Sequence, residues 1–222
     1  MIMSQNYTIL FDLDGTIVDT APDLMAAHNH VMKKFGHDEK KLEDIKTLAG
    51  KGTWLMMQRS FKKEVTNEGV KKEMTKEFLD FYSKNIDKDS KAIKGIVNFL
   101  KWAKIKNIST AVCTNKQEKL AIDLLKKIKL FDYFEYIAGC DTFDFNKPDP
   151  RHLTNVVEII GGDLKKTIMV GDSEVDANSA HNANIPFVLV EGGYTERRID
   201  EIKHDVLIKN FVGFEKIVEK FL

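Results

Sequence analysis

Short, continuously apolar runs alternate with helical patterns along most of this sequence. The runs lie at residues 8–13, 109–114, 136–140, 167–172, 186–191 and 205–209. Strands with one exposed face alternate apolar and polar residues, whereas parallel strands buried on both faces do not. Because parallel neighbours need a crossover, usually a helix, the alternation predicts an α/β fold with a doubly wound parallel sheet.

The segment after the first run breaks this alternation. From about residue 19 to residue 88, apolar residues recur three or four positions apart, which is typical of helices, and no run is typical of a strand. An insertion into the sheet is the simplest explanation. We therefore expect a Rossmann-like core at residues 1–16 and 89–222, with an inserted helical domain at residues 17–88.

Composition narrows the range of partners. The 222 residues include 34 basic and 34 acidic side chains, so no net charge favours nucleic acid or an anionic membrane. No apolar stretch approaches the roughly 20 residues that span a bilayer, and the first residues lack the pattern of a signal peptide. We expect a cytoplasmic protein without a nucleic acid or membrane partner. The sequence does not predict the oligomeric state.

Two aspartates follow the first apolar run, in the stretch TILFDLDGTIVDT (residues 8–20). Asp12 lies at the carboxyl end of the predicted strand, where open α/β sheets bind their ligands. Asp14 is two positions further on, so both carboxylates lean to the same side if the chain stays extended. A tight turn is the alternative, because Asp-Gly is a common turn pair. A calcium loop fits less well, since it requires glycine at the sixth position and here the glycine is fourth.

Polar side chains also follow other predicted strands. Thr114 and Asn115 follow one run, Asp172 ends another with Asp176 four residues later, and Lys147 lies in the loop FNKPDP. Each alone has an ordinary explanation as a helix cap or a solvated side chain. Together, at the shared edge of a parallel sheet, they suit a phosphoryl group and Mg²⁺, which prefers carboxylate, water and phosphate oxygens.

Four motifs in a fixed order resemble those of a known family. FDLDGT, CTNK, NKPDP and GDSEVD are similar to the four motifs of the haloacid dehalogenase superfamily of phosphatases. The resemblance covers the whole predicted core, and the helical insertion after the first motif is similar to the family's helical cap. LAGKGTWLMMQRSF (residues 48–61) resembles the cap segment of phosphoglycolate phosphatases, with Met56 in place of an expected leucine.

The resemblance implies a covalent mechanism. Asp12 would be the nucleophile that forms an aspartyl-phosphate. Asp14 would be the general acid and base, and its backbone carbonyl would reach the metal. Asp12, Asp14 and Asp172 would hold Mg²⁺, and Asp176 would support the metal site from just outside. Repulsion between like charges would couple the titration of Asp12 and Asp14.

The remaining motif residues would bind the phosphoryl group. The Thr114 hydroxyl and the Asn115 amide would hydrogen-bond its oxygens. The backbone N–H groups of Gly15 and Thr16, which follow the nucleophile, would donate to the same oxygens. Lys147 would pair with the phosphoryl group and with the nucleophile, and so spread the charge that develops during transfer.

The helical insertion would select the substrate. The glycines of AGKGTW would free backbone N–H groups at a helix start, where Lys51 and Gly52 would bind a second anionic group of the substrate. Arg59 would add a further positive charge. A flexible start to a helix is the alternative explanation for these glycines. With the resemblance, we expect 2-phosphoglycolate as the substrate, hydrolysed to glycolate and phosphate.

Other functions remain open from the sequence. A β-phosphoglucomutase-like phosphoryl transferase would use the same core and a similar cap. A phosphatase for another small phosphate ester, or for pyrophosphate, would do so too. From a different class, a non-catalytic phosphoryl-binding protein would retain the fold, although every motif position here carries the residue that catalysis requires.

Overall fold

A six-stranded parallel sheet forms the centre of the protein. The structure, a computed structural model, describes residues 7–50, 53–61 and 66–221. The strand order is β5-β4-β1-β6-β7-β8. In chain order these strands are β1 (Thr8–Phe11), β4 (Ser109–Cys113), β5 (Tyr136–Ala138), β6 (Thr167–Gly171), β7 (Phe187–Val190) and β8 (Val206–Ile208). Each lies within one of the six apolar runs, and all neighbouring strands pair in parallel, which confirms the predicted α/β fold.

The register of the three central strands decides where their ends lie. Thr8 at the start of β1 is opposite Ser109 of β4 and Thr167 of β6, and Phe11 at its end is opposite Val112 and Val170. The carboxyl ends of β1, β4 and β6 are therefore level. The residues that follow these ends are brought to one edge of the sheet, which is where ligands of open α/β sheets bind.

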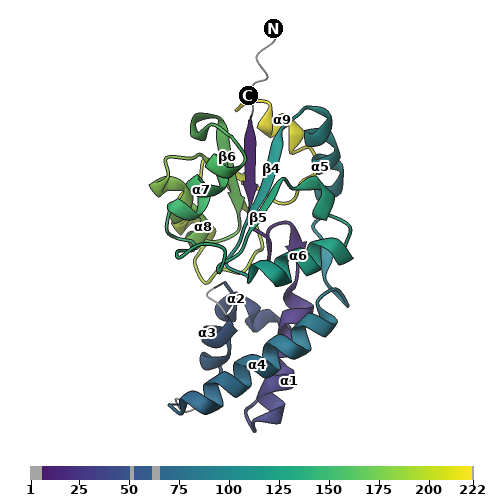
Figure 1. Ribbon diagram of the computed structural model, residues 1–222, viewed down its shortest axis with the longest axis vertical. Helices are drawn as coiled ribbons and strands as arrows, with labels where there is room; N and C mark the ends of the chain where they lie inside the picture. Colours follow the sequence, from purple (N-terminus) through teal and green to yellow (C-terminus); the bar gives the residue numbers. More distant parts are fainter. Residues whose placement is uncertain (1–6, 51–52, 62–65, 222) are drawn as a thin grey trace.

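Helices cover both faces of the sheet (Figure 1). On one face lie α5 (Ile96–Ile105), α6 (Glu118–Lys127) and α9 (Glu215–Val218), and on the other lie α7 (Arg151–Ile159) and α8 (Glu174–Asn182). Successive β1 residues pack into opposite apolar clusters, Ile9 and Phe11 on the α5 side and Leu10 on the α7 side. Burial on both faces accounts for the continuously apolar runs. Short 3₁₀ turns lie in the core at Phe131–Tyr133, Leu164–Lys166 and Ile199–Glu201, and another lies at Leu42–Asp44 in the helical segment that follows β1.

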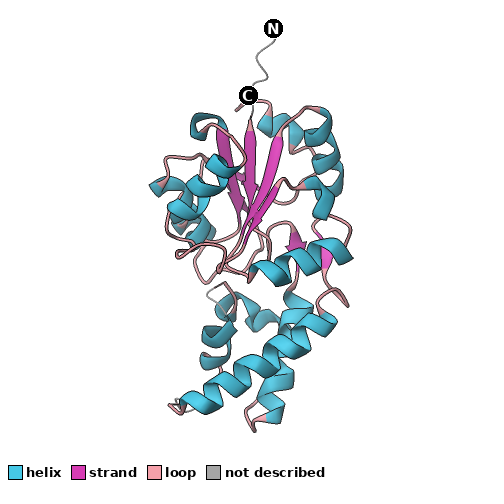
Figure 2. Cartoon of the chain, in the orientation of Figure 1, coloured by secondary structure: helices cyan, strands magenta, loops and turns pink. Residues whose placement is uncertain are grey.

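The helices that follow β1 and precede α5 form a separate layer beyond the carboxyl edge of the sheet (Figures 1 and 2). They are α1 (Ala21–Lys34), α2 (Ile45–Leu48), α3 (Thr53–Gln58) and α4 (Glu68–Asn85), and we refer to them as the helical part. The two long helices pack against each other, with an apolar stripe of each facing inward. The Asn67 side chain accepts hydrogen bonds from Gly69 and Val70 and so caps the start of α4.

The helical part is connected to the core by a short ribbon that the sequence did not predict. Strand β2 (Val18–Asp19) pairs with strand β3 (Lys91–Ala92) in antiparallel orientation. Two residues are too few to show a periodic pattern, so nothing in the local sequence indicated these strands. The ribbon lies on both connections between the helical part and the sheet. The division of the chain at residues 17–88 stays a prediction.

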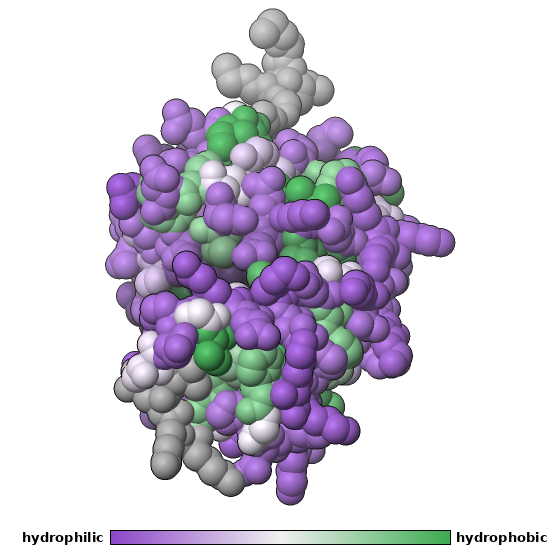
Figure 3. Space-filling model, turned by 60° about the horizontal axis from the view of Figure 1, so that its bottom comes forward, coloured by the Kyte–Doolittle hydropathy of each residue, from purple (hydrophilic) through white to green (hydrophobic). Residues whose placement is uncertain are grey.

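The face of the protein in Figure 3 is mainly polar, as expected when the apolar side chains are packed between the layers. Hydrophilic side chains cover most of the face in Figure 3, and the apolar patches between them are small. The buried apolar residues form one cluster that runs from the sheet into the helical part and a second cluster under α7 and α8. Within the described residues, no helix is long and apolar enough to cross a membrane.

Candidate active site

A cavity of about 470 Å³ lies between the carboxyl edge of the sheet and the helical part. Its core side is lined by seven of the residues that the sequence predicted, namely Asp12, Asp14, Thr114, Asn115, Lys147, Asp172 and Asp176. The helical part contributes mainly apolar side chains, namely Leu24, Trp54, Leu55, Met56, Phe78 and Tyr82. The fold thus brings all four motifs to one cavity.

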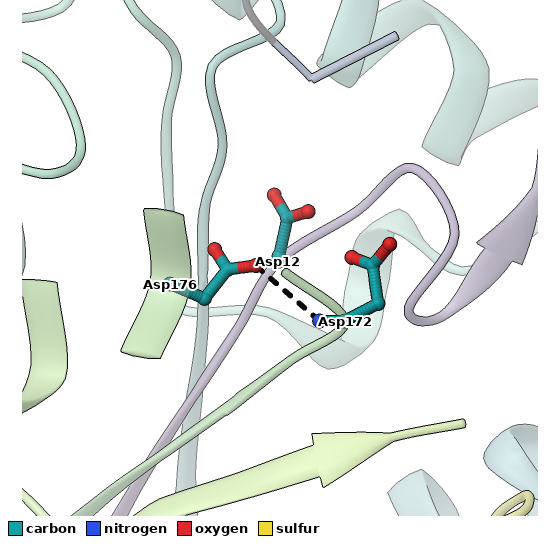
Figure 4. A group of neighbouring side chains, drawn as sticks. All are labelled: Asp12, Asp172 and Asp176. Atoms are coloured by element: carbon teal, nitrogen blue, oxygen red, sulfur yellow. Dashed lines mark hydrogen bonds between the residues drawn. The ribbon is translucent and has the colours of Figure 1, made fainter. Parts of the chain in front are cut away.

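Three buried aspartates that line the cavity form an acidic cluster (Figure 4). One carboxylate oxygen from each of Asp12, Asp172 and Asp176 lies within 4.8 Å of the others. Asp12 follows β1, Asp172 follows β6, and Asp176 lies in the first turn of α8. The Asp176 carboxylate also accepts from the N–H groups of Asp172 and Ser173 and from the Ser173 hydroxyl, which fixes its orientation.

Lys147 is the cation of this cluster. Its Nζ lies 2.7 Å from Asp12 Oδ1 and 2.6 Å from Asp176 Oδ1, and the residue is only 3% exposed. Burial lowers the pKa of Lys147, but the Asp12 and Asp176 carboxylates more than reverse this effect and raise it. The lysine is therefore held charged beside Asp12, as the resemblance implied.

The acidic cluster carries more negative charge than Lys147 can balance. Burial raises the pKa of Asp12 to about 6, an increase that Lys147 opposes and Asp176 enhances. Burial, followed by the charges of Asp12 and Asp176, raises the pKa of Asp172 well above its usual range. Three buried carboxylates beside one lysine are thus compatible with a divalent cation that prefers oxygen ligands.

Asp172 is enclosed by residues that hold both of its oxygens. The Thr16 hydroxyl donates to Oδ1 at 2.8 Å, and the backbone N–H of Tyr194 donates to Oδ2 at 2.6 Å. Gly15 has a φ of +83°, and a Cβ there would lie 2.6 Å from Asp172 Oδ2, so the site requires glycine. Neither Tyr194 nor its loop was among the predicted site residues.

Gly15 and Thr16 support the site differently from the expectation that both N–H groups bind a phosphoryl group. The Gly15 N–H donates to the Val18 carbonyl at 2.8 Å, and the Thr16 N–H donates to the Leu13 carbonyl at 3.3 Å. In this structure the loop after β1 closes on itself and uses these donors. Gly15 therefore shapes the turn and Thr16 holds Asp172, and binding of a phosphoryl group by their N–H groups stays a prediction.

Asp14 is held by a lysine that the sequence analysis missed. Lys116 Nζ lies 2.9 and 3.0 Å from the two Asp14 carboxylate oxygens, and the Thr20 hydroxyl donates to Oδ1 at 2.7 Å. The same Nζ lies 2.7 Å from the Tyr82 hydroxyl of α4 and over the Tyr82 ring. Lys116 belongs to the CTNK motif, so its place two residues after Thr114 was a signal that could have identified it.

Thr114 and Asn115 lie on the cavity wall with partners of their own. Thr114 is 2% exposed, and its hydroxyl oxygen accepts from the Lys116 N–H at 3.2 Å, which leaves the hydroxyl proton free to donate. The Asn115 amide donates to the Lys147 backbone carbonyl at 3.0 Å. Asn115 therefore holds the loop that carries Lys147, in addition to lining the cavity.

Of the predicted cap residues, the structure describes Arg59. Lys51 and Gly52 lie outside the described residues. Arg59 donates to the Thr47 carbonyl and forms an ion pair with Glu196 of the core at 2.6 Å. The Arg59 guanidinium is thus paired with a core carboxylate at the boundary between the helical part and the core. Met56 is buried on the cavity wall.

Comparison with known proteins agrees with this site. The sequence matches the family described as haloacid dehalogenase-like hydrolase over residues 9–190. The chain belongs to this family. It is 39% identical over 218 residues to the phosphoglycolate phosphatase of Agrobacterium fabrum, covering 95% of this chain and 94% of that protein. It is 37% identical over 205 residues to the phosphoglycolate phosphatase of Mesorhizobium japonicum, covering 91% and 90%.

Solved structures of haloacid dehalogenase-like proteins share the whole architecture. The crystal structure of a predicted phosphoglycolate phosphatase from Haemophilus somnus 129PT superposes with a TM-score of 0.90 at 27% identity. The match covers 97% of this chain and 99% of that one. The similarity therefore includes the helical part as well as the sheet, and the family expected from the four motifs is confirmed.

Proposed function

We propose that this protein is a Mg²⁺-dependent phosphatase of small phosphate monoesters, with 2-phosphoglycolate as the preferred substrate. The observation that carries the proposal is the pairing of Asp12 with the buried Lys147 inside a cluster of three carboxylates. A nucleophile that accepts a phosphoryl group needs a fixed cation beside it, because negative charge develops on the phosphoryl oxygens. The names of the relatives support the choice of substrate.

In the proposed reaction, Asp12 and Asp14 divide the chemistry. An Asp12 carboxylate oxygen forms a bond to phosphorus while the ester P–O bond breaks, and the leaving oxygen takes a proton from the Asp14 carboxyl group. Water then attacks the phosphorus of the aspartyl-phosphate, Asp14 takes the proton of that water, and Asp12 is regenerated with release of phosphate. Lys147 and the Thr114 hydroxyl would hold the phosphoryl oxygens throughout.

Asp12, Asp172 and the Asp14 backbone carbonyl would hold Mg²⁺, with Asp176 supporting them. The bound ion would neutralise charge on the phosphoryl oxygens. The excess of buried carboxylates over lysines in this cluster supports its presence. Phe78 and Tyr82 of α4 and Trp54 of α3 would exclude water from the cavity as residues 17–88 act as a cap.

Lys116 supports a substrate with a carboxylate. Among the described residues that line the cavity, Lys116 and Lys147 are the cations. Lys147 contacts two carboxylates, those of Asp12 and Asp176, whereas Lys116 contacts one, that of Asp14. Lys116 lies against Asp14, which would contact the leaving oxygen. In 2-phosphoglycolate the carboxylate carbon is two bonds from that oxygen, so the carboxylate would come within reach of Lys116.

A pair of substrates tests this proposal. 2-Phosphoglycolate and 2-hydroxyethyl phosphate share one skeleton, but only the first carries a carboxylate. We expect Mg²⁺-dependent release of phosphate from both, with kcat/KM higher for 2-phosphoglycolate by about 10-fold to 100-fold, the range of one charge-assisted hydrogen bond. Lys116→Met should lower this ratio toward one, whereas any effect through Asp14 would affect both substrates equally.

The same assay distinguishes the alternatives. Isomerised sugar phosphate in place of free phosphate would indicate a phosphoryl transferase. Absence of turnover across a panel of small esters and pyrophosphate, with and without Mg²⁺, would indicate a phosphoryl-binding protein. An unchanged substrate ratio in Lys116→Met would remove the carboxylate argument and leave the proposed phosphatase chemistry in place.

A further inference from the structure

The segment Gly192–Glu196, which follows β7, contacts both the acidic cluster and the helical part. A Cβ on Gly193 would lie 2.1 Å from Asp172 Oδ2, so this backbone approaches the cluster as closely as glycine allows. The Thr195 hydroxyl donates to Glu174 of α8 at 2.7 Å. Glu196 forms the ion pair with Arg59 of the helical part. One loop thus contacts the acidic cluster, α8 and the helical part.

Tyr194, in the middle of this loop, holds the site with its backbone and the helical part with its side chain. Its N–H donates to Asp172 Oδ2 at 2.6 Å. Its hydroxyl accepts from the backbone N–H groups of Thr20 at 2.9 Å and Ala21 at 2.7 Å, and it donates to Asp19 Oδ1 at 2.8 Å. The two ends of one residue therefore connect Asp172 to the point where β2 becomes α1.

The hydroxyl of Tyr194 is fully used at this position. A phenol offers one donor and two acceptor sites, and the three contacts above fill all of them. Tyr194 is 8% exposed and Thr20 is fully buried, so removal of the hydroxyl would leave the Thr20 N–H without this acceptor and away from solvent. Asp19 is exposed, and its carboxylate also accepts from the Ala21 N–H at 3.3 Å. The Thr20 hydroxyl, which could otherwise cap α1, donates to Asp14. The start of α1 is therefore capped from the core.

The other connection of the helical part is tied to the same helix. Asp23, in the first turn of α1, is 2% exposed. Its carboxylate accepts from the N–H groups of Asp89 and Ser90 and from the Ser90 hydroxyl, at 2.7–3.1 Å. These two residues directly precede β3. A displacement of α1 at its first turn would therefore carry the outgoing connection with it.

We propose that Tyr194 is a positioning residue for the reaction, whose hydroxyl fixes the helical part relative to Asp172. The proposal rests on the proposed phosphatase function. The cavity lies between the core and the helical part. The distance between the acidic cluster and the cavity residues of the helical part therefore stays constant only if the connection between the two layers is fixed. Tyr194 provides this link through a backbone contact on one side and a side-chain contact on the other.

The test is Tyr194→Phe, which keeps the ring and the backbone N–H but removes the hydroxyl. We expect a folded protein whose thermal stabilisation by Mg²⁺ has the same half-saturating concentration within about twofold, because the contact to Asp172 is retained. We expect kcat for 2-phosphoglycolate to fall by about tenfold or more, as a small displacement of positioned groups does. Tyr133→Phe, beside the second residue of β4 and remote from the carboxyl edge, is the matched control.

A fluorescence readout follows the helical part without turnover. Trp54 lines the cavity, and Trp102 of α5 is the other tryptophan of the chain. In a Trp102→Phe background, addition of inorganic phosphate with Mg²⁺ should change Trp54 emission, and Tyr194→Phe should reduce that change. A wild-type protein that shows this response but no phosphatase activity would refute the proposed function while leaving the positioning role testable.

Two results would overturn the positioning role. One is a Tyr194→Phe protein with kcat/KM and Trp54 response within twofold of wild type. The other is a loss of activity matched by an equal loss of Mg²⁺ affinity, which would show that Tyr194 acts only through Asp172. If Tyr194→Phe does not fold, Asp19→Asn weakens the same hydroxyl contact. A folded Asp19→Asn protein should then show a smaller decrease in kcat, and wild-type kinetics there would also overturn the proposal.

Discussion

The two sides of the cavity are built in different ways. On the core side, Asp12, Thr114 and Asp172 follow the ends of β1, β4 and β6, and the backbone ladder of the sheet fixes their spacing. On the other side, the helical part meets the core through side-chain contacts between distant segments, such as Lys116 with Tyr82 and Tyr194 with Thr20. Strand ends in a parallel sheet have little freedom, whereas packed helices joined by two connections can shift.

This difference predicts that the core side of the cavity carries out the chemistry and that the boundary with the helical part selects the substrate. Changes at the core edge should lower turnover of every substrate, because they remove groups that act on the phosphoryl group itself. Changes at the boundary should alter which substrate reacts and how the cavity closes, with smaller effects on an unselective ester. The following predictions test this separation, from the largest expected effect to the smallest.

Asp12→Asn should give the largest loss. The amide is a poor nucleophile, so we expect kcat to fall by about 10⁴-fold or more for every ester, with the fold intact. Phosphate release and circular dichroism measure the two quantities. The exposed Asp132→Asn serves as the control. Activity within tenfold of wild type would exclude Asp12 as the nucleophile.

Lys147→Met should reduce kcat by about 10²-fold to 10³-fold for all substrates, because it removes the cation beside Asp12 and Asp176. It also leaves two buried carboxylates without their partner, which costs about 3–5 kcal/mol in the metal-free protein. Kinetics and thermal unfolding, compared with the exposed Lys101→Met, measure both effects. A loss confined to one substrate would contradict the assignment of Lys147 to the phosphoryl group.

The stability of the metal-free protein should depend on the ionisation of Asp12. Burial raises its pKa from 3.8 to about 6, so the folded state binds more protons than the unfolded state between about pH 4 and 6. Stability from this group is therefore present below about pH 4 and is lost as pH rises to about 6, by about 3 kcal/mol at most. In EDTA, Tm of wild type should fall relative to Asp12→Asn across this window.

Saturating Mg²⁺ supplies the check on that pH dependence. A bound cation favours the charged carboxylate, so Mg²⁺ should remove the difference between wild type and Asp12→Asn above about pH 6. A Tm difference that does not change with pH, with or without Mg²⁺, would show that Asp12 titrates in the same range in the folded and unfolded chains.

Glu196→Gln should have the smallest effect. It breaks the ion pair between Arg59 and Glu196, whose side chains are 24% and 47% exposed, respectively. Such a pair contributes about 0–1 kcal/mol, so we expect little change in Tm, kcat within about twofold, and a modest, salt-dependent rise in KM. Asp200→Asn, which breaks an exposed pair with Arg198 within the core, is the matched control. A tenfold loss of kcat would place this contact among the catalytic requirements.

The motif residues were largely predictable from sequence, and their partners were not. Asp12 and Asp172 lie at the carboxyl ends of apolar runs, Lys147 lies in a proline-bounded loop, and each belongs to a motif, which is why the sequence predicted them. Lys116 lies within one of those motifs but was passed over, because only its contact with Asp14 distinguishes it from a solvated lysine. Tyr194 lies in a loop whose sequence shows no periodicity.

The sequence by itself determined the parallel sheet, and it predicted a helical insertion and the chemistry of the strand ends. Local sequence patterns indicate these features. A strand buried on both faces must be apolar along its length, and a phosphoryl site needs oxygen ligands and a cation. Only the tertiary structure decided the β2–β3 ribbon and the contact of Tyr194 with Thr20. A hydrogen bond between residues 174 positions apart depends on how the layers pack, and no local pattern encodes that.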